Sequence, residues 1–384
     1  MTVDPDRFVT TLQQQGIPFV AGVPDSLLAG LSAAFAQRLS PSEHVIAANE
    51  GAALALCAGY HLATGRVAAT YLQNAGLGNL VNPLLSLVDA EVYGIPVVVI
   101  VGWRGEPGRP DEPQHLKQGR VTIPLLDTMG YPHRVLGESD AEAAEDVAWA
   151  VATATRESTP TFLVVRKGTF GAAPAAPVDE GLAREDALEA VLDALDPDTL
   201  FVATTGMIGR ELFELRERRG ESHDRDFLTV GSMGHASAIA LGVALGRPDR
   251  CVVCLDGDGA MLMHLGSVAV AGQVAPSSFA HVLVNNGAHD SVGGQPTVAF
   301  GVDLTAVARA CGYRTLGTVR TRDEIGPAAA QLFDPPGPAL LEIRVGRGAR
   351  ADLGRPTIDP ADARAAFRAA LGERVGDPAG GGAQ

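Results

Sequence analysis

Aromatic residues, positive charges and long apolar runs are all scarce in this chain. Phe, Trp and Tyr make up 5% of the residues although 46% are hydrophobic, so Ala, Val and Leu must fill most of the core. The formal net charge of −15 would repel nucleic acid and anionic membranes, and we expect neither as a partner. No apolar run approaches about 18 residues, and the N-terminus lacks a signal-peptide pattern. We therefore expect a cytoplasmic protein.

Cysteine is also rare, with Cys57, Cys251, Cys254 and Cys311 as the four positions. Only Cys251 and Cys254 are close in sequence. In an extended strand, residues three apart point to opposite faces, so these two could not hold a zinc ion together. We expect them to pack in the core.

Glycine and proline are abundant, with 45 and 25 residues, and indicate many tight turns. A length of 384 residues predicts two domains. Apolar strands alternate twice with segments of helical length, which predicts an α/β fold of two doubly wound domains with parallel sheets covered on both faces. The predicted strands are 19–21, 45–48, 68–71, 97–101, 161–165, 201–203, 227–230, 251–255, 280–285 and 339–345.

The domain limits follow from composition. A segment rich in Ala, Pro and Gly at 171–186 predicts a linker between a domain over 1–170 and a second over 187–370. The end of the chain, 371–384, contains too few apolar residues to order itself, and we expect a disordered tail.

A single acid, Asp258, lies between Gly257 and Gly259 directly after a predicted strand, and the next apolar strand ends in Asn285 and Asn286. The carboxyl ends of neighbouring parallel strands meet at one edge of a sheet. Carboxylate and carbonyl oxygens there suit Mg²⁺, and glycines with a helix N-terminus let phosphates approach the backbone. The alternative is an ordinary turn.

The spacing from Gly-Asp-Gly to Asn-Asn resembles the motif of the thiamine diphosphate-dependent decarboxylases and synthases. The resemblance implies thiamine diphosphate and Mg²⁺ as cofactors. It also implies that the side chains of Asp258 and Asn286 and the main-chain carbonyl of Ala288 bind Mg²⁺. Gly257, Gly259 and Ala260 would then lie along the diphosphate.

The stretch "VIAANEGAALALCAGYHLATG" places Glu50 at the end of a strand and the start of a helix. This resembles the segment that carries the activating glutamate of the same family. The resemblance implies that Glu50 binds the aminopyrimidine ring of the cofactor and promotes proton loss from its thiazolium ring. The alternative is a first-turn acid favoured by the helix dipole.

Two further segments resemble cofactor contacts of this family. In "VGSMGHASAIALGVAL", the resemblance implies that Gly231 and Met233 contact the cofactor and that Met233 holds it bent, although a methionine in such a stretch is often core. Near "TTGMIGRELF", it implies that Thr205 and Gly206 contact the diphosphate. Because the family's cofactor lies between domains of two subunits, we also expect a homodimer or a dimer of dimers with sites at the subunit interface.

The substrate is suggested by the short form of the chain, which has no room for a middle domain. "AGVPDSLLAGL" and "NNGAHDSVGGQPT" resemble the phosphonopyruvate decarboxylases, with the sulfopyruvate decarboxylases or other decarboxylases of short 2-oxo acids as the alternative. The implied reaction converts 3-phosphonopyruvate to 2-phosphonoacetaldehyde and CO₂, as a step of phosphonate natural-product and antibiotic biosynthesis.

The substrate's anion requires positive charge, and "GWRGEPGRPDEPQHLKQGR" follows a predicted strand end as a loop. We predict that His115 and Lys117 bind the phosphonate, although acidic neighbours nearly balance this segment, as on an ordinary surface loop. Arg166 and Lys167, at the end of another predicted strand, are the alternative.

Four polar residues near the predicted strand ends complete the predicted site. For proton transfer we predict Asp25, His289 and Asp290, with Ser26 also in contact with the substrate.

Two other classes of function stay open. A regulatory or assembly subunit would bind the cofactor without turnover, and intact Glu50, Asp258 and Asn286 argue against it. A nucleotide-binding module would need a Gly-x-Gly-x-x-Gly pattern after an early strand, and the sequence lacks one there.

Overall fold

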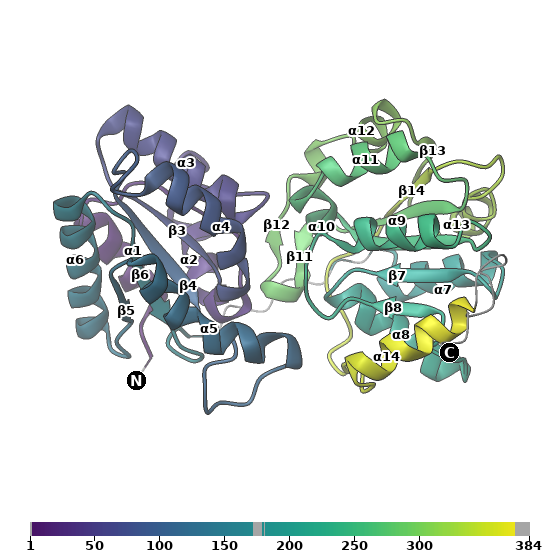
Figure 1. The fold of residues 1–384 in the computed structure, drawn as a ribbon, viewed down its shortest axis with the longest axis horizontal. Coiled ribbons are helices and arrows are strands. Elements are labelled where there is room, and N and C mark those ends of the chain that lie inside the picture. The colour runs from purple at the N-terminus through teal and green to yellow at the C-terminus, as the bar shows by residue number, and fades with distance from the viewer. Residues whose placement is uncertain (1, 172–178, 180, 373–384) are drawn as a thin grey trace, which may run out of the picture. The chain divides into compact units, whose positions relative to one another are not determined.

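The computed structural model describes residues 2–171, 179 and 181–372. The chain divides near residue 176 into two compact units, each built on a six-stranded sheet with helices on both faces (Figure 1). This confirms the predicted fold class. No helix within these ranges is long and apolar enough to span a membrane.

The first unit has one parallel sheet with the strand order β2-β1-β3-β4-β6-β5. Its strands are β1 (Val20–Gly22), β2 (His44–Ile46), β3 (Ala68–Gln73), β4 (Val97–Gly102), β5 (His133–Val135) and β6 (Thr161–Val165). One face packs on α1 (Pro5–Gln14), α2 (Ala29–Arg38) and α6 (Asp140–Glu157). The other packs on α3 (Glu50–Thr64), α4 (Leu77–Pro83) and α5 (Pro113–Met129).

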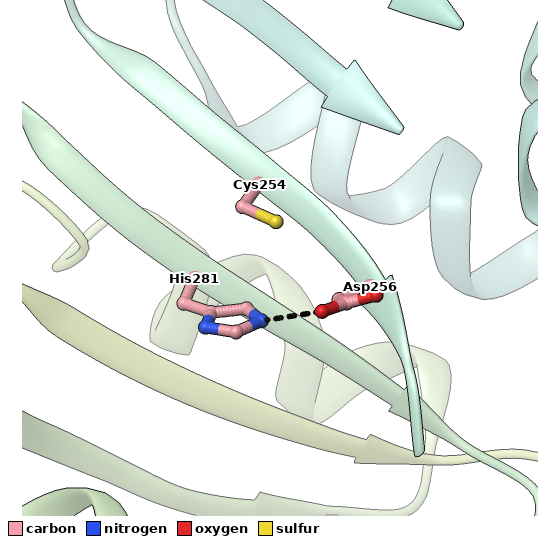
Figure 2. Close-up of side chains that lie close together, drawn as sticks. All are labelled: Cys254, Asp256 and His281. Atoms are coloured by element: carbon pink, nitrogen blue, oxygen red, sulfur yellow. Dashed lines mark ion pairs between the residues drawn. The ribbon is translucent and has the colours of Figure 1, made fainter. Parts of the chain in front are cut away.

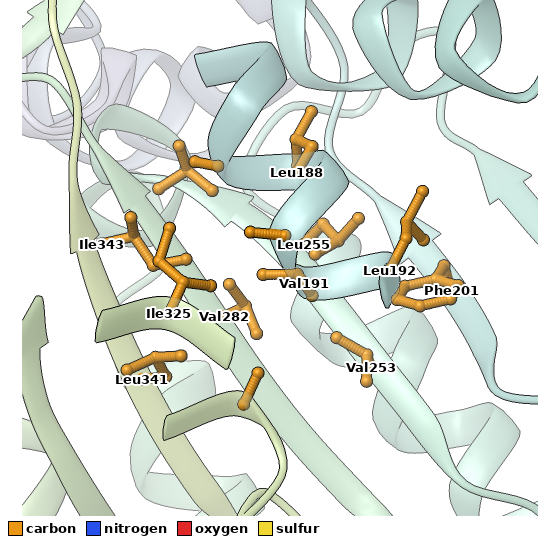
Figure 3. Close-up of a cluster of buried hydrophobic side chains, with 14 of the residues drawn as sticks. Leu188, Val191, Leu192, Phe201, Val253, Leu255, Val282, Ile325, Leu341 and Ile343 are labelled. Carbon is orange, nitrogen blue, oxygen red and sulfur yellow. The ribbon is translucent and has the colours of Figure 1, made fainter. Parts of the chain in front are cut away.

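The second unit also has a parallel sheet, with the order β13-β14-β10-β9-β7-β8. Its strands are β7 (Leu200–Ala203), β8 (Asp226–Leu228), β9 (Val252–Gly257), β10 (Phe279–Asn285), β13 (Arg314–Val319) and β14 (Ala339–Arg344). One face packs on α9 (Ala236–Gly246), α11 (Gly266–Val274) and α12 (Leu304–Ala310), and Figure 2 shows polar side chains on this face. The other packs on α7 (Arg184–Ala194), α8 (Met207–Arg219) and α13 (Arg322–Ala329) through the apolar cluster in Figure 3.

Shorter elements connect these layers. They are the helices α10 (Asp258–Met263) and α14 (Pro360–Leu371), the strands β11 (Ala288–His289) and β12 (Gln295–Pro296), and the single turns η1 (Ser26–Leu28), η2 (Asn74–Gly76), η3 (Leu84–Val88), η4 (Asp290–Val292) and η5 (Ala299–Gly301).

The two sheets share one topology. When the six principal strands of each unit are numbered in chain order, both sheets have the order 2-1-3-4-6-5. Strand 1 lies between strands 2 and 3, so the connections that follow strands 1 and 3 run to opposite sides. In such sheets ligands bind in the crevice between these connections, at the carboxyl ends of strands 1 and 3. We therefore expect ligands to bind at the carboxyl ends of β1 and β3 in the first unit and of β7 and β9 in the second.

The ten predicted strands all occur, with ends within two residues of the predicted ones. One prediction was wrong: the segment after β4 is a loop only as far as Glu112, because Pro113 begins the helix α5, which carries His115 and Lys117. Helix α7 begins inside the predicted linker, whose residues 172–178 and 180 lie outside the described residues. Of the predicted tail, residues 373–384 lie outside them as well.

Candidate active site

In the second unit, Asp258 and Asn286 lie at the same edge of the sheet. Strands β9 and β10 are neighbours with Gly257 opposite Val284, so the residues that follow both strands come together. The main-chain N–H of Asn286 and the hydroxyl of Thr297 donate hydrogen bonds to the carboxyl group of Asp258. That group is 2% exposed, and burial raises its pKa to about 6. A cation beside it would favour the charged form.

The side chain of Asn286 is held at both ends. Its Oδ1 accepts from the N–H of Ala288 at 3.1 Å, and its Nδ2 donates to Oδ2 of Asp290 at 2.6 Å. The same oxygen of Asp290 accepts from Nη1 of Arg184 and from the N–H of Gly348, both at 3.0 Å. Asp290, predicted from sequence for proton transfer, therefore orients the Asn286 amide and is itself held by an arginine that the sequence did not single out.

This arrangement fits the metal that the sequence implies. Asp258, which follows β9, offers a carboxylate oxygen. Asn286 and Ala288, which follow the neighbouring β10, offer an amide oxygen and a main-chain carbonyl oxygen. Mg²⁺ prefers such hard oxygen ligands, and the usual complement of waters or phosphate oxygens completes its octahedron. The donor set fits Mg²⁺ and is a poor match for softer metals.

The N-terminus of α10 is lined closely by the predicted cofactor residues. A Cβ on Gly259 would lie 2.8 Å from the ring of His289 and 3.6 Å from the methyl group of Met233, so these three residues are neighbours. Burial lowers the pKa of His289 to about 4, which makes the imidazole neutral at neutral pH. Ala260, the next residue, is buried.

Four predicted cofactor residues lie on the loops that follow β7 and β8. Thr205 and Gly206 directly precede α8 after β7, and the Thr205 hydroxyl donates to the carbonyl of Val230 at 3.2 Å. Gly231 and Met233 lie in the connection from β8 to α9. The structure thus brings these loops to the β7 and β9 ends of the second sheet, as the topology requires.

In the first unit, Glu50 is the first residue of α3, whose N-terminus is capped by the side chain of Asn49. The carboxyl group is 7% exposed and accepts a hydrogen bond from Nδ2 of Asn79 at 2.6 Å. It lies directly against Gly76, where a Cβ would overlap it. Burial raises the pKa of Glu50 despite this hydrogen bond, so the group is suited to share a proton with a ring nitrogen.

A second buried acid, Asp25, lies between the ends of β1 and β3. Its Oδ1 accepts from Nε2 of Gln73 at 2.6 Å, and its Oδ2 accepts from the N–H of Leu27 at 3.2 Å. Gly102, the last residue of β4, leaves room for this carboxyl group. Burial raises the pKa of Asp25 above its ordinary value. Its position and proton affinity agree with the predicted role in proton transfer, which stays a prediction.

Arg104 is a basic residue close to this acid, in the segment from which the sequence favoured His115 and Lys117 as phosphonate ligands. Its Nη1 donates to Oγ of Ser26 at 2.9 Å and its Nε donates to Asp111 at 2.8 Å, while its charge offsets part of the rise in the pKa of Asp25 that burial causes. Asn74 holds its main chain through hydrogen bonds of 2.8 and 3.1 Å. Its position directly after β4 was the available signal.

Of the predicted phosphonate ligands, His115 lies against the loop that carries Arg104, since a Cβ on Gly105 would come within 1.9 Å of its carbonyl oxygen. His115 is half-buried and Lys117 is exposed, both on α5, and their predicted role stays untested.

Comparison with known proteins accounts for both units. Residues 5–124 match the N-terminal TPP binding domain of thiamine pyrophosphate enzymes, and residues 204–343 match the C-terminal one. A phosphonopyruvate decarboxylase of Streptomyces viridochromogenes is 38% identical, covering 94% of this chain and 93% of the relative. The chain belongs to the phosphonopyruvate decarboxylase family of thiamine pyrophosphate enzymes. A second family member, from Streptomyces hygroscopicus, is 38% identical over 92% of this chain and 90% of its own.

The sulfopyruvate decarboxylase of Methanosarcina acetivorans is more distant, with 26% identity over 83% of this chain and 85% of that protein. The resemblance found in the sequence is therefore confirmed, as are the decarboxylase class and thiamine diphosphate as cofactor. In this chain, Glu50 lies within the range that matches the N-terminal domain, and Asp258 and Asn286 lie within the range that matches the C-terminal domain. The individual site residues remain predictions that the geometry supports.

Proposed function

We propose that this chain catalyses the thiamine diphosphate- and Mg²⁺-dependent conversion of 3-phosphonopyruvate to 2-phosphonoacetaldehyde and CO₂. The observation that carries the proposal is the pair of buried carboxyl groups, Glu50 and Asp258, each at the ligand-binding edge of its own sheet in a chain 38% identical to phosphonopyruvate decarboxylases. The lower identity to the sulfopyruvate decarboxylase favours the phosphonate over the sulfonate substrate.

The residues of the second unit would hold the cofactor's charged end. Asp258, Asn286 and Ala288 would bind Mg²⁺, with Asp290 and Arg184 orienting the Asn286 amide. Gly257, Gly259 and Ala260 would lie along the diphosphate, which the N–H groups at the start of α10 would also face. When bound, thiamine diphosphate supplies an electron sink for the bond to the departing CO₂.

The residues of the first unit would transfer protons and bind the anionic group of the substrate. Glu50 would share a proton with the pyrimidine ring, and its burial raises the pKa of the carboxyl group, which favours holding that proton. Asp25 would exchange a proton with the reacting substrate, beside Ser26 and Arg104. Arg104, which already donates to Ser26, is a charge that the phosphonate can approach, in addition to the predicted His115 and Lys117.

We further propose that the enzyme acts in the cytoplasm as a homodimer or a dimer of dimers, in phosphonate natural-product and antibiotic biosynthesis. In such an assembly, Glu50 of one subunit would complete the site that holds Asp258 of another. The support for this proposal is the family's division of the cofactor between two domains, each of which the chain contains.

The experiment incubates the purified protein with thiamine diphosphate, Mg²⁺ and 3-phosphonopyruvate and measures CO₂ and 2-phosphonoacetaldehyde. Sulfopyruvate and pyruvate serve as matched substrates at equal concentration. We expect the highest kcat/KM for phosphonopyruvate. Turnover of sulfopyruvate alone would replace the substrate assignment, and binding of thiamine diphosphate without turnover of any of the three would indicate a regulatory subunit.

A further inference from the structure

A second polar cluster lies inside the core of the C-terminal unit, on the sheet face covered by α9, α11 and α12. Cys254 and Asp256 project from β9, and His281 projects from β10, where it is paired with Cys254 (Figure 2). All three side chains are fully buried. One ligating atom from each, a sulfur, an oxygen and a nitrogen, lies within 4.8 Å of the other two.

The polar atoms of this cluster are poorly satisfied by the protein. Nε2 of His281 lies 3.4 Å from Oδ2 of Asp256, and neither atom makes a hydrogen bond within the described residues. The same is true of Nδ1 of His281 and of the buried hydroxyl of Tyr313. Buried polar groups of folded proteins nearly always have a partner, so a group of four such atoms in one core indicates a ligand.

We propose that Cys254, Asp256 and His281 bind a zinc ion that is distinct from the Mg²⁺ at Asp258. A thiolate, a carboxylate and a neutral imidazole together carry two negative charges, which Zn²⁺ neutralises, so the centre as a whole can lie in an apolar core. Mg²⁺ and Ca²⁺ are excluded by the soft sulfur ligand. The thiol proton leaves to solvent when the metal binds, and the imidazole binds through Nε2.

The fourth position of a tetrahedral zinc site falls to a water or to the neutral Tyr313 hydroxyl, because burial and the nearby Cys254 and Asp256 raise the pKa of this phenol. Burial raises the pKa of the Cys254 thiol well above its usual range, so a bound cation is what would make a thiolate stable here. Such an ion would connect β9 to β10 directly behind the segment that carries Asp258. Its role is structural, because no solvent-exposed position remains for a substrate.

The test measures metal content without any substrate, so it is independent of the proposed activity. Full-length protein is produced with zinc in the medium, dialysed against Mg²⁺, and analysed by mass spectrometry of its metals. We expect about one zinc ion per chain in the wild type and its loss in Cys254→Ser and His281→Gln. Cys251→Ser, which changes a neighbouring cysteine outside the cluster, is the matched control and should retain zinc.

Asp258→Asn separates the two metal sites and should also retain zinc. A folded wild-type protein without zinc would overturn the proposal, and so would zinc that is lost in Asp258→Asn and retained in Cys254→Ser. If the Cys254 and His281 variants fail to fold, the absorption spectrum of Co²⁺ bound to the wild-type protein tests the site instead. A thiolate-to-cobalt charge-transfer band with the intense visible absorption of tetrahedral Co²⁺ supports the site, and absence of this band contradicts it.

Discussion

The carboxyl group of Glu50 lies directly against Gly76, at a point where even a methyl side chain would overlap it. Asn79 donates to the same carboxyl group at 2.6 Å from the following helix. The glycine therefore sets the position of the acid, and the amide sets its orientation. Because Glu50 is the residue expected to meet the cofactor ring, the space at Gly76 is part of the catalytic geometry.

We expect Gly76→Ala to displace the Glu50 carboxyl and to lower kcat by about 100-fold, the usual effect of misplacing a catalytic group by about 1 Å. Gly78→Ala is the matched control, because a Cβ at Gly78 would meet nothing within 4 Å. Steady-state kinetics with circular dichroism on both variants would check this. Equal kcat values for the two would show that Gly76 is not needed to position Glu50.

The acid itself should carry a stability cost that depends on pH. Burial raises the pKa of Glu50 in the folded protein above its ordinary value of 4.5. The free energy of unfolding therefore has its full value below about pH 4.5, where Glu50 is protonated in both states, and decreases as pH rises through the raised pKa. Glu50→Gln should therefore be more stable than the wild type at pH 7, by about 1.4 kcal/mol for each unit of the shift, and equally stable at pH 4.

The kcat of Glu50→Gln should fall by about 100-fold or more. Urea unfolding at the two pH values, with thiamine diphosphate omitted, checks the stability difference. Lower stability of Glu50→Gln at pH 7 would contradict the assigned pKa direction.

The sequence predicted every central strand of the two six-stranded sheets but only two of their four edge strands, for a physical reason. Central strands such as β4 are buried on both faces and consist of continuous apolar residues. The two strands of these sheets that were missed, β5 and β13, lie at edges and begin with His133 and Arg314, because an edge strand has one side open to water. The short strands β11 and β12 were missed as well, because each has only two residues. Apolar pattern alone could not distinguish them from loops.

The candidate site was predictable only where its residues follow strand ends in a local motif. Asp258 and Asn286 belong to one such motif, and Glu50 begins a helix directly after a strand. Arg184 lies 106 residues from Asp290, its hydrogen-bond partner, and no local pattern connects them. Residues that orient other residues are set by tertiary packing, and only the fold reveals them.

The proposed shared site makes Glu50 and Asp258 variants complementary. Glu50→Gln and Asp258→Asn should each be nearly inactive alone. If one site combines the two residues from different subunits, mixed dimers contain one intact site of two, and equal co-expression should restore about a quarter of wild-type activity.

Co-expression with two different affinity tags, followed by purification on both, isolates the mixed dimer for the assay. The double variant Glu50→Gln/Asp258→Asn co-expressed with either single variant is the control and should stay inactive. A mixed dimer with no more activity than the single variants would place both residues of each site in the same subunit.

Asp290 should determine metal affinity more than chemistry. Asp290→Asn removes the charge that holds the Asn286 amide, and we expect the Mg²⁺ concentration for half-maximal activity to rise by about 10- to 100-fold. Arg184 keeps its bidentate partner Glu211, at 2.7 and 2.8 Å, so the fold should persist. At saturating Mg²⁺, kcat should recover to within a few-fold of wild type.

Titration of activity with Mg²⁺ makes this measurement, and Asp249→Asn, which removes a surface acid paired with Arg247, is its control. A low kcat that excess Mg²⁺ does not restore would instead support the proton-transfer role predicted from the sequence.

Arg104 and Lys117 offer competing sites for the phosphonate. Arg104 lies beside Ser26 and the buried Asp25, close to the ends of β1 and β3 where ligands bind in this topology, whereas Lys117 is an exposed residue of α5. Loss of one hydrogen bond to a charged group corresponds to about 10- to 100-fold in affinity. We therefore expect Arg104→Met to raise KM for phosphonopyruvate by that factor and Lys117→Met to leave it nearly unchanged.

Because Arg104 also binds Asp111, the double variant Arg104→Met/Asp111→Asn separates loss of the substrate contact from an unpaired carboxylate. The double variant should keep the raised KM while recovering the wild-type melting temperature more closely than Arg104→Met does. If Lys117→Met raises KM and the two Arg104 variants do not, the phosphonate binds along α5, as the sequence pattern first indicated.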